Sequence, residues 1–260
     1  MTGSPRPVAL VTGASRGIGA ATARELGRRG YHVIVNYRVN AGAAQATVSA
    51  VESGGGTAAA RAADVCDLAQ ARALTSAVMA EWGRIDVLVC NANTGRPSFA
   101  ALESLTWDDF IGTVTGELAG AFFITQCVLD VMRPQGHGQI IYISSTAADF
   151  AGPGRLSQST AKSALNTFSR HVAAEAGPYG ITVNTVAPGA VRTEASAGML
   201  TAEREDQLRR TSVLGRMVEP DDVAAAVGML AGDTVRAVTG AVIRVDAGYG
   251  VLAGGPSSRG

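Results

Sequence analysis

The sequence has almost no lysine. Of its 22 basic residues only Lys162 is a lysine, and it lies in the uncharged run "LSQSTAKSAL" at 156–165. Arginine is not an equivalent of lysine, because the guanidinium is a planar, permanently protonated fork whereas the ammonium is compact and sits on a flexible stem. A single lysine kept among arginines therefore suggests a chemical role. The alternative is a solvated helix residue that remained by chance.

A net charge of one sign is also absent. The 22 basic residues balance 22 acidic ones, so the chain lacks the basic surface that nucleic acids and anionic membranes attract. No apolar run is expected to be long enough to cross a bilayer. The stretch "MTGSPRP" has no hydrophobic segment behind a positive one, so no secretory signal is expected. We therefore predict binding to neither nucleic acid nor membrane.

Cysteines are few and scattered. Cys66, Cys90 and Cys127 are odd in number and have neither the spacing of metal ligands nor that of a disulfide framework. This usage is typical of a reducing compartment, where thiols stay unpaired. We expect a cytoplasmic protein without a metal site.

What the sequence does contain is a regular alternation of apolar, strand-like runs and alanine-rich helical segments. Strands are predicted at 7–13, 31–37, 57–65, 85–92, 138–145, 181–189 and 241–248. The helical region that ends near Met132 is predicted in two pieces. This alternation predicts a parallel sheet with helices on both faces. The expected fold is α/β: one Rossmann-like, doubly wound domain over 1–260 with about seven strands and a flexible tail at 252–260.

The first predicted strand runs into "VTGASRGIG" at 11–19, a glycine-rich turn that opens the first helix. Glycines let the backbone bend sharply and approach a pyrophosphate, and the helix N-terminus offers unpaired N–H groups to it. An ordinary glycine turn is the alternative, but the place between strand and helix supports dinucleotide binding. The predicted cofactor contacts in this turn are Gly13, Ser15, Arg16, Gly17, Ile18 and Gly19.

The end of the second predicted strand distinguishes NAD from NADP. An acid there binds the ribose 2′-hydroxyl, whereas an arginine accommodates a 2′-phosphate. Asn36 ends this strand, Arg38 follows, and no acidic residue is near in the sequence. With Arg16 in the glycine turn, this favours NADPH; the alternative is that both arginines are solvated. Asp64 and Val65, at the end of the third strand, are expected beside the adenine.

These features together resemble the classical short-chain dehydrogenase/reductase family, most closely the 3-oxoacyl-[acyl-carrier-protein] reductase type. The matching pieces occur in order: "TGASRGIG" at 12–19, "LVCNA" at 88–92, "ISS" at 143–145, "NTVAPGAVRTE" at 184–194 and "TGAVIRVDAG" at 239–248. The resemblance covers nearly the whole chain. It implies further cofactor contacts at Asn91, Ala92, Lys162, Pro188, Gly189, Val191 and Thr193.

The resemblance also implies catalytic positions. In the family a serine polarises the substrate carbonyl, and Ser145 holds that position. A lysine binds the nicotinamide ribose and lowers the pKa of a tyrosine four residues earlier; Lys162 matches the lysine, but Gln158 stands where the tyrosine is expected. An amide has no titratable proton, so Gln158 cannot be the general acid. An asparagine of the family, which holds a water near the lysine, is matched by Glu117.

The proton-transfer groups are therefore expected to differ from those of the family. If Glu117 and Lys162 both point into the site they pair, and the pair becomes the candidate proton donor. Three functions stay open. The first is an NADPH-dependent reductase with a non-standard proton donor that acts on a ketone, a related carbonyl or an imine. The others are a redox-neutral dehydratase, cyclase or isomerase, and a catalytically inactive NADPH-binding partner subunit.

The substrate region is expected after the sixth strand. Residues 190–218 are predicted to form a lid, in which "TAEREDQLRR" at 201–210 is typical of a charged amphipathic helix. The resemblance implies a small-molecule or acyl-thioester substrate, free or bound to a carrier protein. It also implies a homo-oligomer, a tetramer or a dimer, built on the helices after the fourth and fifth strands. A hetero-oligomer is the alternative.

Overall fold

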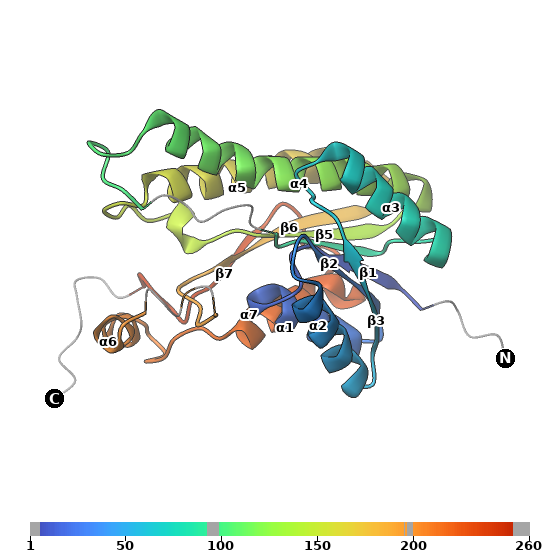
Figure 1. Ribbon diagram of the computed structural model, residues 1–260, viewed down its shortest axis with the longest axis horizontal. Coiled ribbons are helices and arrows are strands. Elements are labelled where there is room, and N and C mark those ends of the chain that lie inside the picture. The colour runs from blue at the N-terminus through green and yellow to red at the C-terminus, as the bar shows by residue number, and fades with distance from the viewer. Residues whose placement is uncertain (1–5, 93–98, 195, 197–199, 252–260) are drawn as a thin grey trace.

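The computed structural model describes residues 6–92, 99–194, 196 and 200–251. These residues form three layers, with a sheet between two layers of helices (Figure 1). The strands are β1 (Val8–Val11), β2 (His32–Tyr37), β3 (Thr57–Ala62), β4 (Val87–Cys90), β5 (Gly138–Ile143), β6 (Ile181–Pro188) and β7 (Val242–Val245). The helices are α1 (Gly17–Arg28), α2 (Ala41–Ser53), α3 (Leu68–Trp82), α4 (Trp107–Gln135), α5 (Leu156–Ala176), α6 (Ala202–Arg210) and α7 (Pro220–Ala231), with short 3-10 helices η1 (Thr146–Ala148), η2 (Gly177–Tyr179) and η3 (Asp233–Val235).

The strands are all parallel and lie in the order β3-β2-β1-β4-β5-β6-β7. The chain starts in the middle of the sheet, builds one half as far as β3, and then returns to add β4 on the other side of β1. The direction of winding thus reverses between β1 and β4, which is where sheets of this kind bind ligands at their carboxyl ends. The predicted doubly wound, Rossmann-like α/β domain is confirmed.

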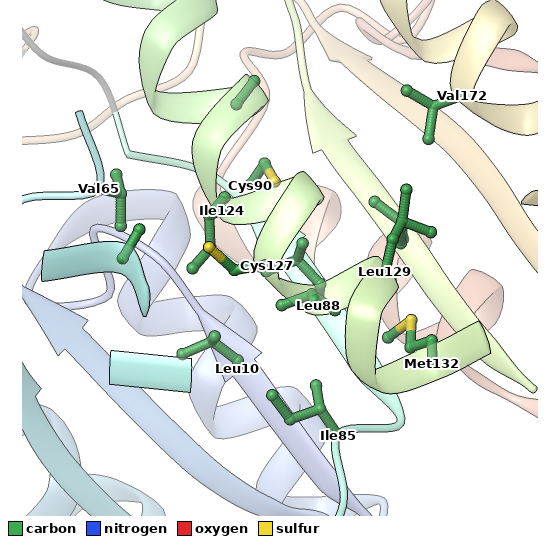
Figure 2. Close-up of a cluster of buried hydrophobic side chains, with 14 of the residues drawn as sticks. Leu10, Val65, Ile85, Leu88, Cys90, Ile124, Cys127, Leu129, Met132 and Val172 are labelled. Carbon is green, nitrogen blue, oxygen red and sulfur yellow. The ribbon is translucent and has the colours of Figure 1, made fainter. Parts of the chain in front are cut away.

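Both faces of the sheet are covered. Helices α3, α4 and α5 lie over one face, and α1, α2 and α7 lie over the other (Figure 1). Along β1 the side chains alternate, so Leu10 joins the core on the α4 side and Val11 joins the core on the α1 side. Figure 2 shows the α4 side, where Leu10 and Leu88 lie under Ile124 and Met132 of α4. This two-sided burial explains why the strands read as continuous apolar runs.

Helix α4 departs from two sequence predictions. It is one continuous helix, Trp107–Gln135, and not two pieces; Thr106 caps its start by accepting a hydrogen bond from the N–H of Asp109 at 3.1 Å. By length and composition it is also apolar enough to cross a membrane, contrary to expectation. Its residues Ile124 and Val128 are fully buried in the core. Packing against the sheet therefore accounts for the apolar residues on the buried side of this helix.

The polar segment at 201–210 forms α6, as predicted. Thr201 caps it by accepting a hydrogen bond from the N–H of Arg204 at 3.2 Å, and none of its residues is buried. The predicted lid, 190–218, is described except for residues 195 and 197–199. The predicted flexible tail, 252–260, lies outside the described residues.

Candidate active site

A cleft of about 550 Å³ opens at the carboxyl ends of the strands, next to the neighbouring strands β1 and β4, where the direction of winding reverses. Nearly all of the predicted cofactor residues line it: Gly13, Ser15, Arg16, Gly17, Ile18, Asn36, Arg38, Asp64, Val65, Asn91, Ala92, Lys162, Pro188, Gly189, Val191 and Thr193. Of the predicted catalytic residues, Ser145, Gln158 and Lys162 line the cleft. Glu117 and Gly19 do not line it. The fold thus gathers residues from six strand ends into one site.

Gly19 has a packing role that differs from the direct cofactor contact predicted for it. A Cβ atom at this position would collide with the carbonyl oxygen of Gly13 and would come within 2.5 Å of Nδ2 of Asn91. Real Cβ atoms essentially never approach other atoms so closely. The absence of a side chain at Gly19 therefore lets helix α1 pack directly behind the turn.

A hydrogen-bonded brace holds the turn after β1. Oγ1 of Thr12 accepts hydrogen bonds from the N–H groups of Asn91 and Ala92, both at 3.0 Å. Nδ2 of Asn91 donates to the carbonyl oxygen of Gly13 at 3.0 Å, and Oδ1 of the buried Asn36 accepts from the N–H of Gly13 at 3.4 Å. Asn36 and Asn91 thus shape the turn as well as line the cleft. Thr12 was missed by the sequence predictions, because only the fold brings β4 beside it.

The shape of the turn fits a dinucleotide. Gly13 and Gly17 have φ of +61° and +54°, values that residues with a side chain rarely adopt. A Cβ on Gly13 would lie 2.8 Å from Cα of Ala92, so this wall of the cleft is bare backbone. Helix α1 begins at Gly17 and has no acidic residue in its first turn, so its N–H groups are suited to a diphosphate.

The far end of the cleft has two arginines and one acid. Arg16 and Arg38 both line it, as the predicted binding of a 2′-phosphate requires. Nη1 of Arg38, however, lies 3.6 Å from Oδ2 of Asp64, which comes from the end of β3. An exposed pair of this kind is weak, so Arg38 can turn toward a phosphate. Asp64 nevertheless competes for it, although no acid is near Arg38 in the sequence.

At the other end of the cleft, α5 presents the reactive side chains. Gln158 and Lys162 are four residues apart and so share one face of the helix. Nζ of Lys162 donates to the carbonyl oxygen of Ile143 at 3.0 Å and to Oε1 of Glu117 at 2.6 Å. The side chains of Lys162 and Glu117 are only 10% and 9% exposed. The predicted pairing of these two residues is therefore present in the structure.

Among the described residues, the side chains of Ser145 and Gln158 each have one hydrogen bond. Oγ of Ser145 accepts from the N–H of Ala147 at 3.1 Å, so its own hydroxyl proton can be donated to a ligand. Oε1 of Gln158 accepts from Nη1 of Arg155 at 3.1 Å. Arg155 was missed by the sequence predictions; its position three residues before Gln158 on the first turn of α5 was the available signal.

Two further titratable groups near the site are unsuited to proton transfer there. Burial raises the pKa of the Cys90 thiol to about 12, although a hydrogen bond with Thr125 acts in the opposite direction. Burial likewise raises the pKa of Tyr142 well above its usual range, and its hydroxyl lies 2.8 Å from Oγ1 of Thr125. Both groups belong to the core under α4, and neither lines the cleft.

A parallel sheet wound in two directions, with a glycine turn and a polar cleft at the reversal, defines a dinucleotide-binding protein of the Rossmann type. The chain belongs to the short-chain dehydrogenase/reductase family. The family described as "Enoyl-(Acyl carrier protein) reductase" matches residues 13–250. The protein is accordingly an oxidoreductase of the short-chain dehydrogenase/reductase type.

Individual relatives agree with this assignment. An uncharacterized oxidoreductase of Methylorubrum extorquens is 41% identical over 93% of this chain and 96% of its own. A 3-oxoacyl-[acyl-carrier-protein] reductase of Synechocystis is 36% identical over 95% of this chain and 98% of its own. Among solved structures, a short-chain type dehydrogenase/reductase from Mycobacterium ulcerans superposes with a TM-score of 0.89 at 27% identity, covering 96% of this chain and 91% of that one.

Proposed function

We propose that the protein is an NADPH-dependent reductase of a carbonyl substrate, in which Lys162 and Glu117 supply the proton that a tyrosine supplies in the family. The observation that carries the proposal is the 2.6 Å contact between Nζ of Lys162 and Oε1 of Glu117, beside a cleft lined by Ser145 and Gln158. Gln158 stands at the position where the family resemblance implies a catalytic tyrosine, and its amide has no titratable proton to transfer. The titratable pair is the proton source within reach of the same cleft.

The residues have distinct roles in this reaction. When bound, NADPH supplies the hydride to the carbonyl carbon. Ser145 donates a hydrogen bond to the carbonyl oxygen and holds the substrate in place. That oxygen takes a proton from Nζ of Lys162, and the proton is replaced through Glu117 from water. In sum, a ketone, NADPH and one proton give an alcohol and NADP⁺.

The remaining groups of the cleft would hold the cofactor. The glycine turn and the start of α1 suit the diphosphate, and Lys162, which lines the cleft, would hold the nicotinamide ribose as the family resemblance implies. The choice of NADPH rests on Arg16 and Arg38, which line the end of the cleft next to β2. The backbone and polar walls of the turn offer donors to a diphosphate without a competing acid on α1.

The substrate class follows from the resemblance to 3-oxoacyl-[acyl-carrier-protein] reductases. We expect a β-ketoacyl-like ketone or thioester, free or bound to a carrier protein, with residues 190–218 closing over it. We also expect a cytoplasmic homo-oligomer, a tetramer or a dimer, that uses α4 and α5. Phe122 of α4 is 47% exposed, which is consistent with a partner on that face.

The test is NADPH consumption with a β-ketobutyryl thioester and a small diketone, alongside a titration of NADPH binding. We expect one alcohol formed per NADPH oxidised, and loss of turnover in Lys162→Met. Tight NADPH binding without turnover of any ketone would favour an inactive partner subunit. Conversion of a substrate without consumption of NADPH would favour a redox-neutral enzyme.

A further inference from the structure

We propose that Arg155 is a positioning residue that decides which end of the Gln158 amide faces the cleft, and that the site therefore selects neutral carbonyl groups. The proposal rests on the proposed reductase function for its reaction. The geometry lies at the start of α5. Arg155 is the residue just before the helix, and its side chain donates a hydrogen bond to Gln158, three residues later.

The chemistry of the two side chains fixes the direction of the hydrogen bond. An arginine can only donate, whereas the glutamine amide has one accepting and one donating end. Nη1 of Arg155 lies 3.1 Å from Gln158, so the end that meets it has to be the oxygen Oε1. Because Gln158 lines the cleft, its Nε2 is the end left to face the cleft. Gln158 thus presents N–H donors to a ligand.

Arg155 is itself held in place. Its guanidinium lies over the ring of Phe99, 5.6 Å from the ring centre, which is within the range of a cation–π contact. Its carbonyl oxygen accepts a hydrogen bond from the N–H of Ser159 at 2.8 Å, at the start of α5. The preceding Gly154 has φ of +68° and packs against the backbone of Phe99 and Ala100. Both the backbone and the head group of Arg155 are therefore anchored.

The result is a pair of donors in one cleft. Oγ of Ser145 accepts from the N–H of Ala147, which leaves its hydroxyl proton free to be donated to the ligand. Together with Nε2 of Gln158 it suits an oxygen that accepts two hydrogen bonds and gains negative charge during the reaction. A protonated imine has an N–H and no lone pair, so it cannot accept a hydrogen bond from Nε2 of Gln158. The end of the amide that Arg155 leaves toward the cleft therefore favours C=O over C=N⁺–H.

The first test measures ketone affinity in the dead-end complex with NADP⁺, using a β-ketobutyryl thioester. Arg155→Glu replaces the donor by an acceptor, which attracts Nε2 and turns Oε1 to the cleft. We expect the affinity for the thioester to fall roughly tenfold, since a facing acceptor replaces a donor, with NADP⁺ affinity unchanged. Arg155→Lys keeps a donor and should stay within about threefold of the unmodified protein.

A matched control separates the effect of turning the Gln158 amide from the effect of reversing a charge on the protein. Arg170→Glu makes the same charge reversal at an exposed position of the same helix, and it should leave thioester affinity unchanged. Gln158→Glu keeps the size of the side chain but removes both N–H donors, so it should weaken the thioester as Arg155→Glu does. Thermal unfolding of each variant checks that the protein remains folded.

A spectroscopic readout reports the donors directly. Two hydrogen bonds lower the stretching frequency of the β-keto carbonyl, which is labelled with ¹³C in the β-ketobutyryl thioester, in the NADP⁺ complex. In Arg155→Glu and Gln158→Glu the band should move back toward its position in water-free solvent. Equal affinities and equal band positions in Arg155→Glu and Arg170→Glu would overturn the proposal, as would an unmodified protein that binds no keto thioester. Binding without NADPH oxidation would instead refute only the reductase function.

Discussion

Glu117 of α4 contacts Lys162 of α5 at 2.6 Å, across 45 residues of sequence. The two helices pack against each other over the same face of the sheet (Figure 1), and the ion pair lies between them beside the cleft. Removing one member of a buried pair leaves an uncompensated charge. Each residue is therefore tested with a change that keeps the size of its side chain.

The first prediction is that Glu117→Gln abolishes turnover without loss of cofactor affinity. The amide keeps the size of the side chain but cannot relay a proton, so we expect kcat to fall by about 100-fold or more. Glu117 does not line the cleft, so NADPH affinity should stay nearly constant in a binding titration. Glu175→Gln, at an exposed position of α5, is the control. A Glu117→Gln enzyme with most of its activity would remove this residue from the mechanism.

The second prediction concerns the choice of cofactor. Arg38→Asp should narrow or reverse a preference for NADPH over NADH, because it places an acid where the 2′-phosphate is expected. Asp64→Asn should act in the opposite direction, since it releases Arg38 from the ion pair at 3.6 Å. Dissociation constants for both cofactors measure this. Equal affinity of the unmodified protein for NADPH and NADH would contradict the assignment.

The third prediction is that Glu194→Gln tightens NADPH binding. Glu194 lines the cleft, and its Oε2 lies 4.0 Å from the point where a Cβ of Gly17 would be. A carboxylate there repels a diphosphate at the start of α1, so its neutralisation should lower Kd by about threefold to tenfold. The gain should shrink at high salt, which screens exposed charges. Glu52→Gln, on an exposed part of α2, should have no effect, and weaker binding by Glu194→Gln would show that this carboxylate helps to hold the cofactor.

The fourth prediction concerns Gln158→Tyr. The phenol is larger than the amide and cannot keep the hydrogen bond that Oε1 accepts from Arg155. If the site is adapted to a reaction that uses no tyrosine, we expect this change to reduce turnover of the native substrate while NADPH still binds. A disabled reductase would instead gain activity toward generic ketones, alone or with Glu117→Asn. Initial rates with a panel of ketones distinguish the two results.

The fifth prediction concerns stability at the amino ends of the strands. Burial acts to raise the pKa of Asp86, but hydrogen bonds from Arg84, the N–H of Val8 and His137 outweigh it and hold the pKa below the usual 3.8. A carboxylate with a lowered folded-state pKa stabilises the fold above its unfolded-state pKa, and that contribution is lost as pH falls through the folded-state value.

We therefore expect Asp86→Ala to lower the free energy of unfolding by about 3 kcal/mol at neutral pH. The difference from the unmodified protein should shrink as pH falls below about 4, where the carboxyl of the unfolded chain takes up a proton, and down through the lower folded-state pKa. Denaturant unfolding at neutral and acidic pH measures both values. Asp221→Ala, which breaks an exposed pair with Arg24, should change stability by less than about 1 kcal/mol. Equal losses in the two variants would refute the role given to Asp86.

The class of fold and the place of the cleft at the strand ends follow from local features of the sequence. Strands and helices each have a characteristic spacing of apolar residues, and this spacing depends only on residues that are close together in the sequence. The glycine turn after the first strand and the four-residue spacing of Gln158 and Lys162 are local in the same sense. For this reason the parallel sheet, the cleft-lining glycines and the shared face of α5 were all predicted.

The tertiary structure decided which distant residues meet. The order of strands brings Asp64 to Arg38 and Asn91 to Thr12, and no spacing in the sequence encodes that order. Packing placed Gly19 behind the turn, and α4 forms one continuous helix although its sequence pattern predicts two pieces. The contact between Glu117 and Lys162 was conceivable from sequence, but only the packing of α4 on α5 brings carboxylate and ammonium to hydrogen-bonding distance.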